Sequence, residues 1–237
     1  MRHLLKVNDL SAYYGESQIL KDISMTVEQG QLVVMLGPNG HGKSTLLKSI
    51  CGLVENVQGQ ITYGGKEING LATEKIVNLG VTYIAENREL FPHMSVLDNL
   101  KLGAYSRNAR AAENDNLQKV FKLFPQLQDR KKQIASTMSG GEARMLAIAR
   151  GLMSNADFLC IDEPSIGLQP NLVHEVFDVI KEINQQGKTI LLVEQNIPQV
   201  VDLADKIYVI EEGHISFEGS RDDALSNEHL KEIFLGL

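Results

Sequence analysis

The chain has 237 residues, a length that fits one large domain or a core with one inserted subdomain. Hydrophobic residues make up 43% of it and charged residues 22%, which is ordinary for a packed globular protein and excludes a disordered or fibrous one. The formal charge of −7 argues against nucleic acid as a partner, because a phosphate backbone requires a basic surface. No apolar run reaches the roughly 18 residues of a membrane-spanning helix, and we expect no signal peptide at the N-terminus.

Residues 1–30 and 57–70 have the pattern of antiparallel strands, with a hairpin turn expected at Gly64 and Gly65. Continuous apolar runs, typical of parallel strands buried on both faces, lie at residues 32–36, 158–161, 190–193 and 207–210. Helical periodicity is found between them at residues 43–50, 143–153 and 172–184. Strands that alternate with helices predict an α/β fold with a parallel sheet.

Residues 92–153 interrupt this alternation. They contain no strand pattern, and helices are predicted there at 96–102, 116–124 and 143–153. We therefore expect one domain over residues 1–237, made of three parts and a tail. The parts are an antiparallel β subdomain (1–30 and 57–70), a nucleotide-binding α/β core (31–56, 71–91 and 154–220), a helical subdomain (92–153) and a C-terminal helical tail (221–237).

The two cysteines, Cys51 and Cys160, lie in apolar surroundings, and we expect both to be reduced core residues. The histidines show no metal-ligand spacing, since the sequence has neither His-Glu-x-x-His nor Cys-x-x-Cys. A structural metal site is therefore not expected.

A glycine-rich segment follows the apolar run 32–36 and leads into the helix predicted from Lys43. Its residues fit G-x-x-x-x-G-K-[ST], and they are Gly37, Pro38, Asn39, Gly40, His41, Gly42, Lys43 and Ser44, with Thr45 next. Glycines let backbone N–H groups turn inward around a phosphate, and the new helix presents its unpaired N–H groups to the same anion. Lys43 is predicted to bind the β- and γ-phosphates and Ser44 to bind Mg²⁺. The alternative, a glycine-rich turn that happens to precede a helix, is disfavoured by the strand–loop–helix setting.

The apolar run 158–161 ends in two acids, Asp162 and Glu163. In a parallel sheet, ligands and catalytic groups gather at the carboxyl ends of the strands. Asp162 is therefore predicted to face the Mg²⁺ shell beside Ser44, and Glu163 to polarise the attacking water. Alone, two such acids are more typical of a solvated turn; together with the phosphate loop they indicate hydrolysis.

Ser139-Gly140-Gly141-Glu142 precedes the helix predicted over 143–153. Ser139 and Glu142 fit a capping box, which accounts for the serine and the glutamate but not for two consecutive glycines. Glycines at a helix start allow close backbone approach to a ligand. In identity, order and spacing, the phosphate loop, this segment and residues 158–163 resemble the Walker A, signature and Walker B motifs of an ABC nucleotide-binding domain. The resemblance covers essentially the whole chain.

This resemblance implies an ATPase that uses ATP and Mg²⁺, with a P-loop core, an antiparallel β subdomain and an inserted helical subdomain. Tyr14 stands 29 residues before Lys43, where the family's adenine-stacking aromatic residue lies. Two such domains meet head to tail in this family. By that analogy, the nucleotide bound to the partner subunit is contacted by Ser139, Gly140, Gly141 and Glu142.

A narrower likeness is to the ATPases of branched-chain amino acid importers, above all the second, shorter of the two. It is carried by residues 85–91, 138–148, 193–196 and 234–236, although Ala85 and Asn87 replace a Pro and a Gly of that group. The ATPase of urea importers is nearly as similar.

Four residues depart from the general ABC pattern. That pattern has Gln where Glu86 and Glu142 stand, His where Gln195 stands, and usually Asp where Gln169 stands. The first three match the branched-chain group, so they do not indicate an inactive enzyme. Glu86 can bind Mg²⁺ but adds negative charge near the γ-phosphate, and Gln195 can orient water or a phosphate oxygen without becoming cationic. His41 stands where a small residue is usual; we expect its side chain to point outward, the alternative being a phosphate or partner contact.

The resemblance implies a subunit that powers import of branched-chain or related amino acids at the cytoplasmic face of the inner membrane. The expected partners are a second ABC ATPase subunit, transmembrane permease subunits docked near residues 86–105, and, indirectly, a substrate-binding protein. The alternatives are a urea or amide importer ATPase, a soluble ABC ATPase outside transport, a regulatory nucleotide-binding subunit, or another P-loop enzyme. Lys43 and Glu163 argue against a regulatory subunit, and a GTPase would need an [NT]-K-x-D motif, which the sequence lacks.

Overall fold

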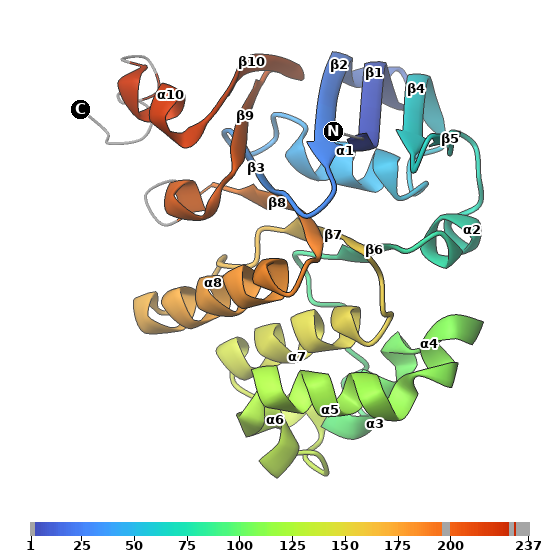
Figure 1. Ribbon diagram of the computed structural model, residues 1–237, viewed down its shortest axis with the longest axis vertical. Helices are drawn as coiled ribbons and strands as arrows, with labels where there is room; N and C mark the ends of the chain where they lie inside the picture. Colours follow the sequence, from blue (N-terminus) through green and yellow to red (C-terminus); the bar gives the residue numbers. More distant parts are fainter. Residues whose placement is uncertain (1–2, 196–199, 228–229, 231–237) are drawn as a thin grey trace.

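Two β-sheets form the frame of the molecule, and helices cover the outer face of one of them (Figure 1). The computed structural model describes residues 3–195, 200–227 and 230. A four-stranded antiparallel sheet has the order β2-β1-β4-β5, and a six-stranded sheet has the order β10-β9-β3-β8-β7-β6.

The antiparallel sheet is built from both segments predicted to form one. Its strands are β1 (His3–Tyr14), β2 (Ser17–Glu28), β4 (Asn56–Tyr63) and β5 (Lys66–Glu67). Tyr63 pairs with Lys66 across a two-residue turn in which Gly64 and Gly65 both have positive φ, as the tightest hairpins require. The predicted hairpin is confirmed.

The six-stranded sheet carries the site. Its strands are β3 (Leu32–Leu36), β6 (Val81–Ile84), β7 (Phe158–Asp162), β8 (Thr189–Glu194), β9 (Lys206–Glu211) and β10 (His214–Gly219). All four predicted apolar runs are strands of this sheet and pair in parallel. The sheet is parallel over the predicted strands but not throughout, because β10 pairs antiparallel with β9. This edge strand alternates half-buried and exposed residues, so it lacks the continuous apolar run used to find the others.

Both faces of the six-stranded sheet are buried, which explains those continuous apolar runs. On β3, Val33 and Met35 face a core shared with α1 (Lys43–Ile50) and the antiparallel sheet. Leu32, Val34 and Leu36 face a second core on the opposite side, formed with the helices drawn below the sheet in Figure 1. Cys51 and Cys160 lie in the first core as free, buried cysteines, as expected.

The helical region below the sheet contains the three predicted helices, each somewhat longer than predicted, together with additional short helices. They are α3 (Val96–Gly103), α4 (Arg107–Ala111), α5 (Glu113–Leu123), α6 (Pro125–Asp129), a 3₁₀ turn (Ala135–Thr137) and α7 (Gly140–Leu152). The part of the chain that the structure describes also contains α2 (Thr73–Asn78), α8 (Pro170–Gln185), a 3₁₀ turn (Val201–Leu203) and α10 (Arg221–Ser226). Among the described residues, no helix is both long and apolar enough to cross a membrane. The P-loop core, antiparallel β subdomain and inserted helical region together confirm the predicted fold class.

Candidate nucleotide site

The phosphate loop connects β3 to α1 and takes its shape from its glycines. Gly37, Gly40 and Gly42 have φ angles of 151°, 81° and 107°, which disfavour any residue with a side chain. A Cβ on Gly37 would lie 2.2 Å from the carbonyl oxygen of Ile210, so β9 leaves no room beside the loop. Gly42 begins α1 without a side-chain cap, and no acidic residue lies in the first turn. This end of α1 is therefore electropositive and suited to an anion.

Lys43 lies across this loop with its ammonium group almost fully buried. Its Nζ donates to the carbonyl oxygens of Gly37 at 2.8 Å and Pro38 at 3.0 Å, and it pairs with Oε1 of Glu163 at 3.2 Å. The side chain of Lys43 is 3% exposed, so its charge depends on these partners. The contact with Glu163 joins the phosphate loop to the carboxyl end of β7.

Asp162 is the last residue of β7 and accepts a hydrogen bond on each carboxylate oxygen. The Ser44 hydroxyl donates to Oδ1 at 3.0 Å, and the Tyr83 hydroxyl donates to Oδ2 at 2.7 Å. Burial raises the pKa of the Asp162 carboxyl, against these two hydrogen bonds, which lower it. A buried carboxylate beside a hydroxyl is a pair of oxygen ligands that a hard cation would stabilise.

Glu163 follows in a left-handed backbone conformation, with φ of 42°. Its backbone N–H donates to Val193 at 2.9 Å, which ties the residue to the end of β8. Non-glycine residues in this conformation cost about 1 kcal/mol or more and tend to cluster at functional sites. Here the conformation turns the Glu163 side chain toward Lys43.

Two cavities meet at Glu163. The smaller one, about 240 Å³, is lined by Asn39, Gly40, Gly42, Lys43, Ser44, Thr45, Glu86, Glu163 and Ile166. We call it the nucleotide cleft. The larger one, about 480 Å³, shares Glu163 and Ile166 with it and also includes Glu194 and Gln195. The structure thus brings the predicted loop residues, Glu86 and Glu163 into one cleft and opens Gln195 onto the neighbouring cavity.

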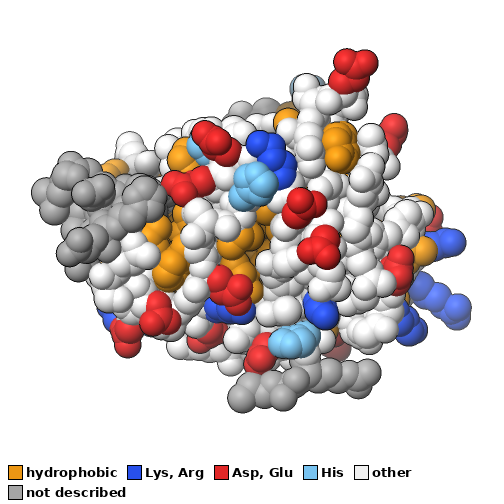
Figure 2. All heavy atoms as spheres, turned by 90° about the horizontal axis from the view of Figure 1, so that it is seen from above, with side chains coloured by type: hydrophobic (Ala, Val, Ile, Leu, Met, Phe, Trp, Pro, Cys, Tyr) orange, Lys and Arg blue, Asp and Glu red, His pale blue; other side chains and the backbone are white. Residues whose placement is uncertain are grey.

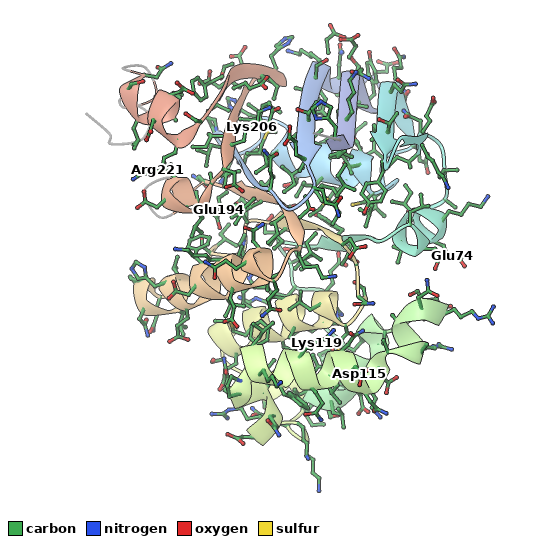
Figure 3. The ribbon with its side chains drawn as sticks, viewed as in Figure 1. Glu74, Asp115, Lys119, Glu194, Lys206 and Arg221 are labelled. Carbon is green, nitrogen blue, oxygen red and sulfur yellow. The ribbon has the colours of Figure 1, made fainter. Side chains whose placement is uncertain are left out.

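Glu194 ends β8 and holds the two segments that flank this second cavity (Figure 3). Its buried carboxylate accepts the backbone N–H of Ser165 at 2.9 Å and that of Gln195 at 3.0 Å. The Glu194 carboxylate therefore fixes the position of the Gln195 backbone. Asn196 and residues 234–236, which took part in the sequence resemblance, lie outside the described residues.

Two residues predicted to contact nucleotide, Tyr14 and His41, are not among those that line the nucleotide cleft. Tyr14 ends β1 with 48% of its surface exposed and is not among the residues that line the nucleotide cleft. His41 does not simply point outward, because its Nδ1 accepts the backbone N–H of Glu212 at 3.0 Å. This bond links the phosphate loop to the turn between β9 and β10, a contact that neither sequence alternative included.

The signature segment lies at the N-terminus of α7, apart from the nucleotide cleft. The predicted capping box is present: Ser139 Oγ accepts from Glu142 N at 3.3 Å, and Glu142 Oε2 accepts from Ser139 N at 2.8 Å. Ser139 is the N-cap residue and Glu142 lies in the first turn of the helix. The helix α7 therefore begins at Gly140, three residues before the predicted start. Ser139 and Gly140 are exposed, whereas Gly141 is buried. A Cβ on Gly141 would lie 2.4 Å from Leu172, so packing against α8 also explains this glycine, which the sequence had assigned to ligand approach alone.

Magnesium fits the residues at the end of β7. Asp162 and Ser44 provide a buried carboxylate and a hydroxyl, and Mg²⁺ prefers oxygen ligands, of which proteins usually supply only one or two beside phosphates and water. The described residues contain no cluster of three or more His, Cys, Asp or Glu able to hold a metal alone. The donor set is therefore that of a metal bound together with a phosphate ligand.

Sequence reasoning assigned no role to two residues of the site, Tyr83 and Glu194, although Glu194 lies in a segment that carried the resemblance. Tyr83 lies on β6, a strand that was not named, and its hydroxyl reaches Asp162 across the sheet. The apolar run 81–84 after Gly80 was the available signal. For Glu194, the position after a buried strand was the signal, as it was for Asp162.

One face of the molecule carries charged side chains of both signs (Figure 2). On the face seen in Figure 2, acidic side chains are scattered and the basic ones do not form a continuous patch. The net charge is −7.

The strand–loop–helix around Lys43 and the acids at the end of β7 define a P-loop nucleotide-binding protein. A family model described as "ABC transporter" matches residues 20–166. The chain belongs to the ABC transporter family, as an ATP-binding subunit with ATPase activity.

Individual relatives and structures agree over the whole length. The chain is 39% identical over 233 residues to the "High-affinity branched-chain amino acid transport ATP-binding protein BraG" of Pseudomonas aeruginosa, covering 98% of this chain and 100% of that one. It is 35% identical to the "Probable branched-chain amino acid transport ATP-binding protein LivF" of Archaeoglobus fulgidus, covering 99% of both. A solved ATP-binding cassette of an ABC transporter, MJ1267 in its ADP conformation, superposes with a TM-score of 0.84 at 28% identity, covering 100% of both chains.

Proposed function

We propose that this protein hydrolyses ATP to power uptake of branched-chain amino acids through separate permease subunits. One observation carries the ATPase chemistry: Lys43 contacts Glu163 at 3.2 Å while the adjacent Ser44 contacts Asp162 at 3.0 Å. Phosphate-binding and hydrolytic groups thus face each other across one cleft. The cargo rests on the relatives that share 39% and 35% identity over the full length, both named for branched-chain amino acid transport.

The residues of the cleft take separate roles in this proposal. The loop N–H groups, with the positive end of α1, bind the phosphate chain, and Lys43 exchanges its contact with Glu163 for the β- and γ-phosphates. Ser44, Asp162 and Glu86 would hold Mg²⁺, which neutralises phosphate charge when bound. Tyr14 stacks on adenine from the end of β1.

Hydrolysis is assigned to Glu163 and Gln195. Glu163, once Lys43 turns to the phosphates, is a free carboxylate beside them and accepts a proton from the attacking water. Gln195 opens onto the cavity that adjoins Glu163 and orients that water or a phosphate oxygen through its amide. Glu194 supports this step by fixing the backbone of Gln195.

The signature segment serves a second ATPase subunit. Ser139 and Gly140 are exposed and lie away from this chain's own cleft, which suits contact with nucleotide bound by another subunit. Such a dimer closes when ATP is shared between the two and opens after hydrolysis. In this proposal it works at the cytoplasmic face of the inner membrane beneath its permease, and a substrate-binding protein delivers the cargo.

Reconstitution tests the proposal. The chain would be combined with its candidate partner ATPase, permease subunits and binding protein in vesicles, and ATP-dependent uptake of labelled leucine and labelled urea compared. Leucine uptake that requires this subunit supports the assignment. Urea uptake instead would move the cargo to the urea group, and uptake independent of this subunit would remove it from transport.

A further inference from the structure

Arg144 is the largest side chain that the fold buries completely. It lies on α7, five residues after Ser139, and is 1% exposed. A buried guanidinium loses its hydration, so it is retained at reasonable cost only where acidic groups and hydrogen-bond acceptors surround it. Its surroundings therefore indicate what its charge is for.

The hydrogen bonds of Arg144 are incomplete. Its Nη1 donates to the carbonyl oxygen of Ala85 at 3.3 Å, while its Nε has no hydrogen-bond partner among the described residues. A group that served only to hold the fold together would be expected to have its donors satisfied. The bond from Nη1 goes to the residue immediately before Glu86.

Three acidic groups of the site act electrostatically on this guanidinium. The attractive charges that act on Arg144 come from Glu194, Glu86 and Asp162, and a repulsive one comes from Arg88. Glu194 and Asp162 end β8 and β7, and Glu86 follows the end of β6 by two residues. The nucleotide cleft and its neighbouring cavity open at this edge of the sheet. Arg144 thus connects the signature helix to the residue immediately before Glu86, which lines the cleft.

The charge balance of the cleft explains why a cation there is useful. Glu86 and Glu163 line the cleft and Asp162 lies beside Ser44, whereas Lys43 is the one cationic side chain among the described residues that line it. Lys43 already pairs with Glu163. Among the described residues that line the cleft, none is left to offset the negative charge of Glu86, which repels an entering polyphosphate.

We propose that Arg144 is a positioning residue for the nucleotide cleft, which holds the segment before Glu86 and offsets the Glu86 carboxylate so that the cleft accepts a phosphate chain. The inference rests on the proposed function, since the ligand is ATP. It also gives α7 two separate roles, because its first turn faces the partner subunit while Arg144 acts on the chain's own site.

Arg150 provides a matched control on the same helix. Its Nη1 and Nη2 donate to the carbonyl oxygens of Glu89 at 2.6 Å and Arg88 at 2.9 Å, so it also holds the segment after β6. The acidic group that acts on it is Glu89, which does not line the cleft. Removing Arg150 therefore disturbs this segment without removing the positive charge that offsets the Glu86 carboxylate.

The experiment is a double-mutant cycle on ATP affinity. The dissociation constant of a fluorescent ATP analogue would be measured without divalent metal for the wild type, Arg144→Met, Glu86→Gln and the double variant. A control cycle uses Arg150→Met in place of Arg144→Met. Arg144→Met is expected to weaken binding about fivefold, and by less than about twofold once Glu86 is Gln. Arg150→Met is expected to change affinity by the same factor in both backgrounds.

Thermal unfolding of each variant separates this role from a structural one, because removing one member of a set of buried charges can itself destabilise the fold. Should Arg144→Met not fold, Arg144→Gln, which can still donate to Ala85, takes its place in the cycle. If Arg144→Met weakens binding by the same factor whether residue 86 is Glu or Gln, the inference is overturned. The proposed function, which requires only that the wild type binds ATP, is not affected by that result. A wild-type chain that does not bind the analogue would instead overturn the proposed function.

Discussion

The hydroxyl of Tyr83 donates a 2.7 Å hydrogen bond to Oδ2 of Asp162 and so joins β6 to the acidic end of β7. Burial raises the pKa of the Tyr83 phenol, so it remains a donor at any physiological pH. Ser44 occupies the other oxygen of the same carboxylate. Asp162 is thus held between the phosphate loop and the neighbouring strand.

Tyr83→Phe removes one of the two donors and is expected to lower the free energy of unfolding by about 1–2 kcal/mol in metal-free buffer. Burial already raises the pKa of Asp162 above its usual 3.8, and loss of the Tyr83 bond raises it further. In Tyr83→Phe the ionised Asp162 carboxylate has lost a donor, so the variant is less stable than the wild type where Asp162 is ionised. The difference in unfolding free energy should therefore be full above the raised pKa and shrink as pH falls below it. Urea unfolding from pH 4 to pH 8 measures this. A deficit that grows toward low pH would contradict it.

Gly37→Ala and Gly40→Ala form a matched pair in the phosphate loop. Both glycines have positive φ, but a Cβ at Gly37 meets the Ile210 carbonyl oxygen at 2.2 Å, whereas nothing lies within 4 Å of a Cβ at Gly40. Gly40→Ala should cost about 1 kcal/mol of stability for its backbone alone. Gly37→Ala should cost several kcal/mol, because β9 must also move. Similar unfolding midpoints for the two variants would show that β9 does not constrain the loop.

Glu142→Ala tests the capping box of α7. Its hydrogen bond from the Ser139 backbone holds the pKa of Glu142 below its usual 4.5, so the carboxylate stabilises the fold above that value and its contribution is lost as pH falls through the lowered pKa. The variant should lose about 1 kcal/mol at neutral pH and match the wild type in acid.

Asp223→Ala is the control for this variant, since Ser220 and Asp223 form the same capping box on α10. Both substitutions should reduce stability at neutral pH. Only Glu142→Ala should reduce the ATPase rate of the assembled transporter, because α7 begins at the segment proposed to meet the second subunit. Equal ATPase rates in the two variants would remove Glu142 from that contact.

Gln195→His should introduce a pH dependence. An amide does not titrate, whereas a free imidazole changes charge near ~6.5. Wild-type ATP hydrolysis is therefore expected to vary less between pH 6 and pH 7 than hydrolysis by Gln195→His. Initial rates of ATP hydrolysis across this range provide the comparison. If the pH profiles of the wild type and Gln195→His superimpose, the role assigned to Gln195 is wrong.

The sequence predicted those parts of the site that depend on local pattern. The phosphate loop, Asp162 and Glu163 were found because a strand followed by glycines or acids is visible in one short window. Tyr83 and Arg144 were not, because their importance arises from contacts 79 and 59 positions away, to Asp162 and Ala85. A tyrosine in a short apolar run and an arginine on a helix give no local sign of such partners.

The same limit applies to the fold. Continuous apolar runs identified the four central strands, but β10 alternates half-buried and exposed residues at the sheet edge and was missed. The start of α7 was placed too late because the capping residues were treated as a loop.

The measurement that tests the central claim most directly is ATP turnover by the assembled subunit, compared with its Glu163→Gln variant. The Gln side chain keeps the size of Glu163 but cannot accept a proton from water. ATP binding is expected to persist in Glu163→Gln while turnover falls at least about 100-fold. Turnover that survives the substitution would mean that another group activates the water, and the roles assigned around Glu163 would then be wrong.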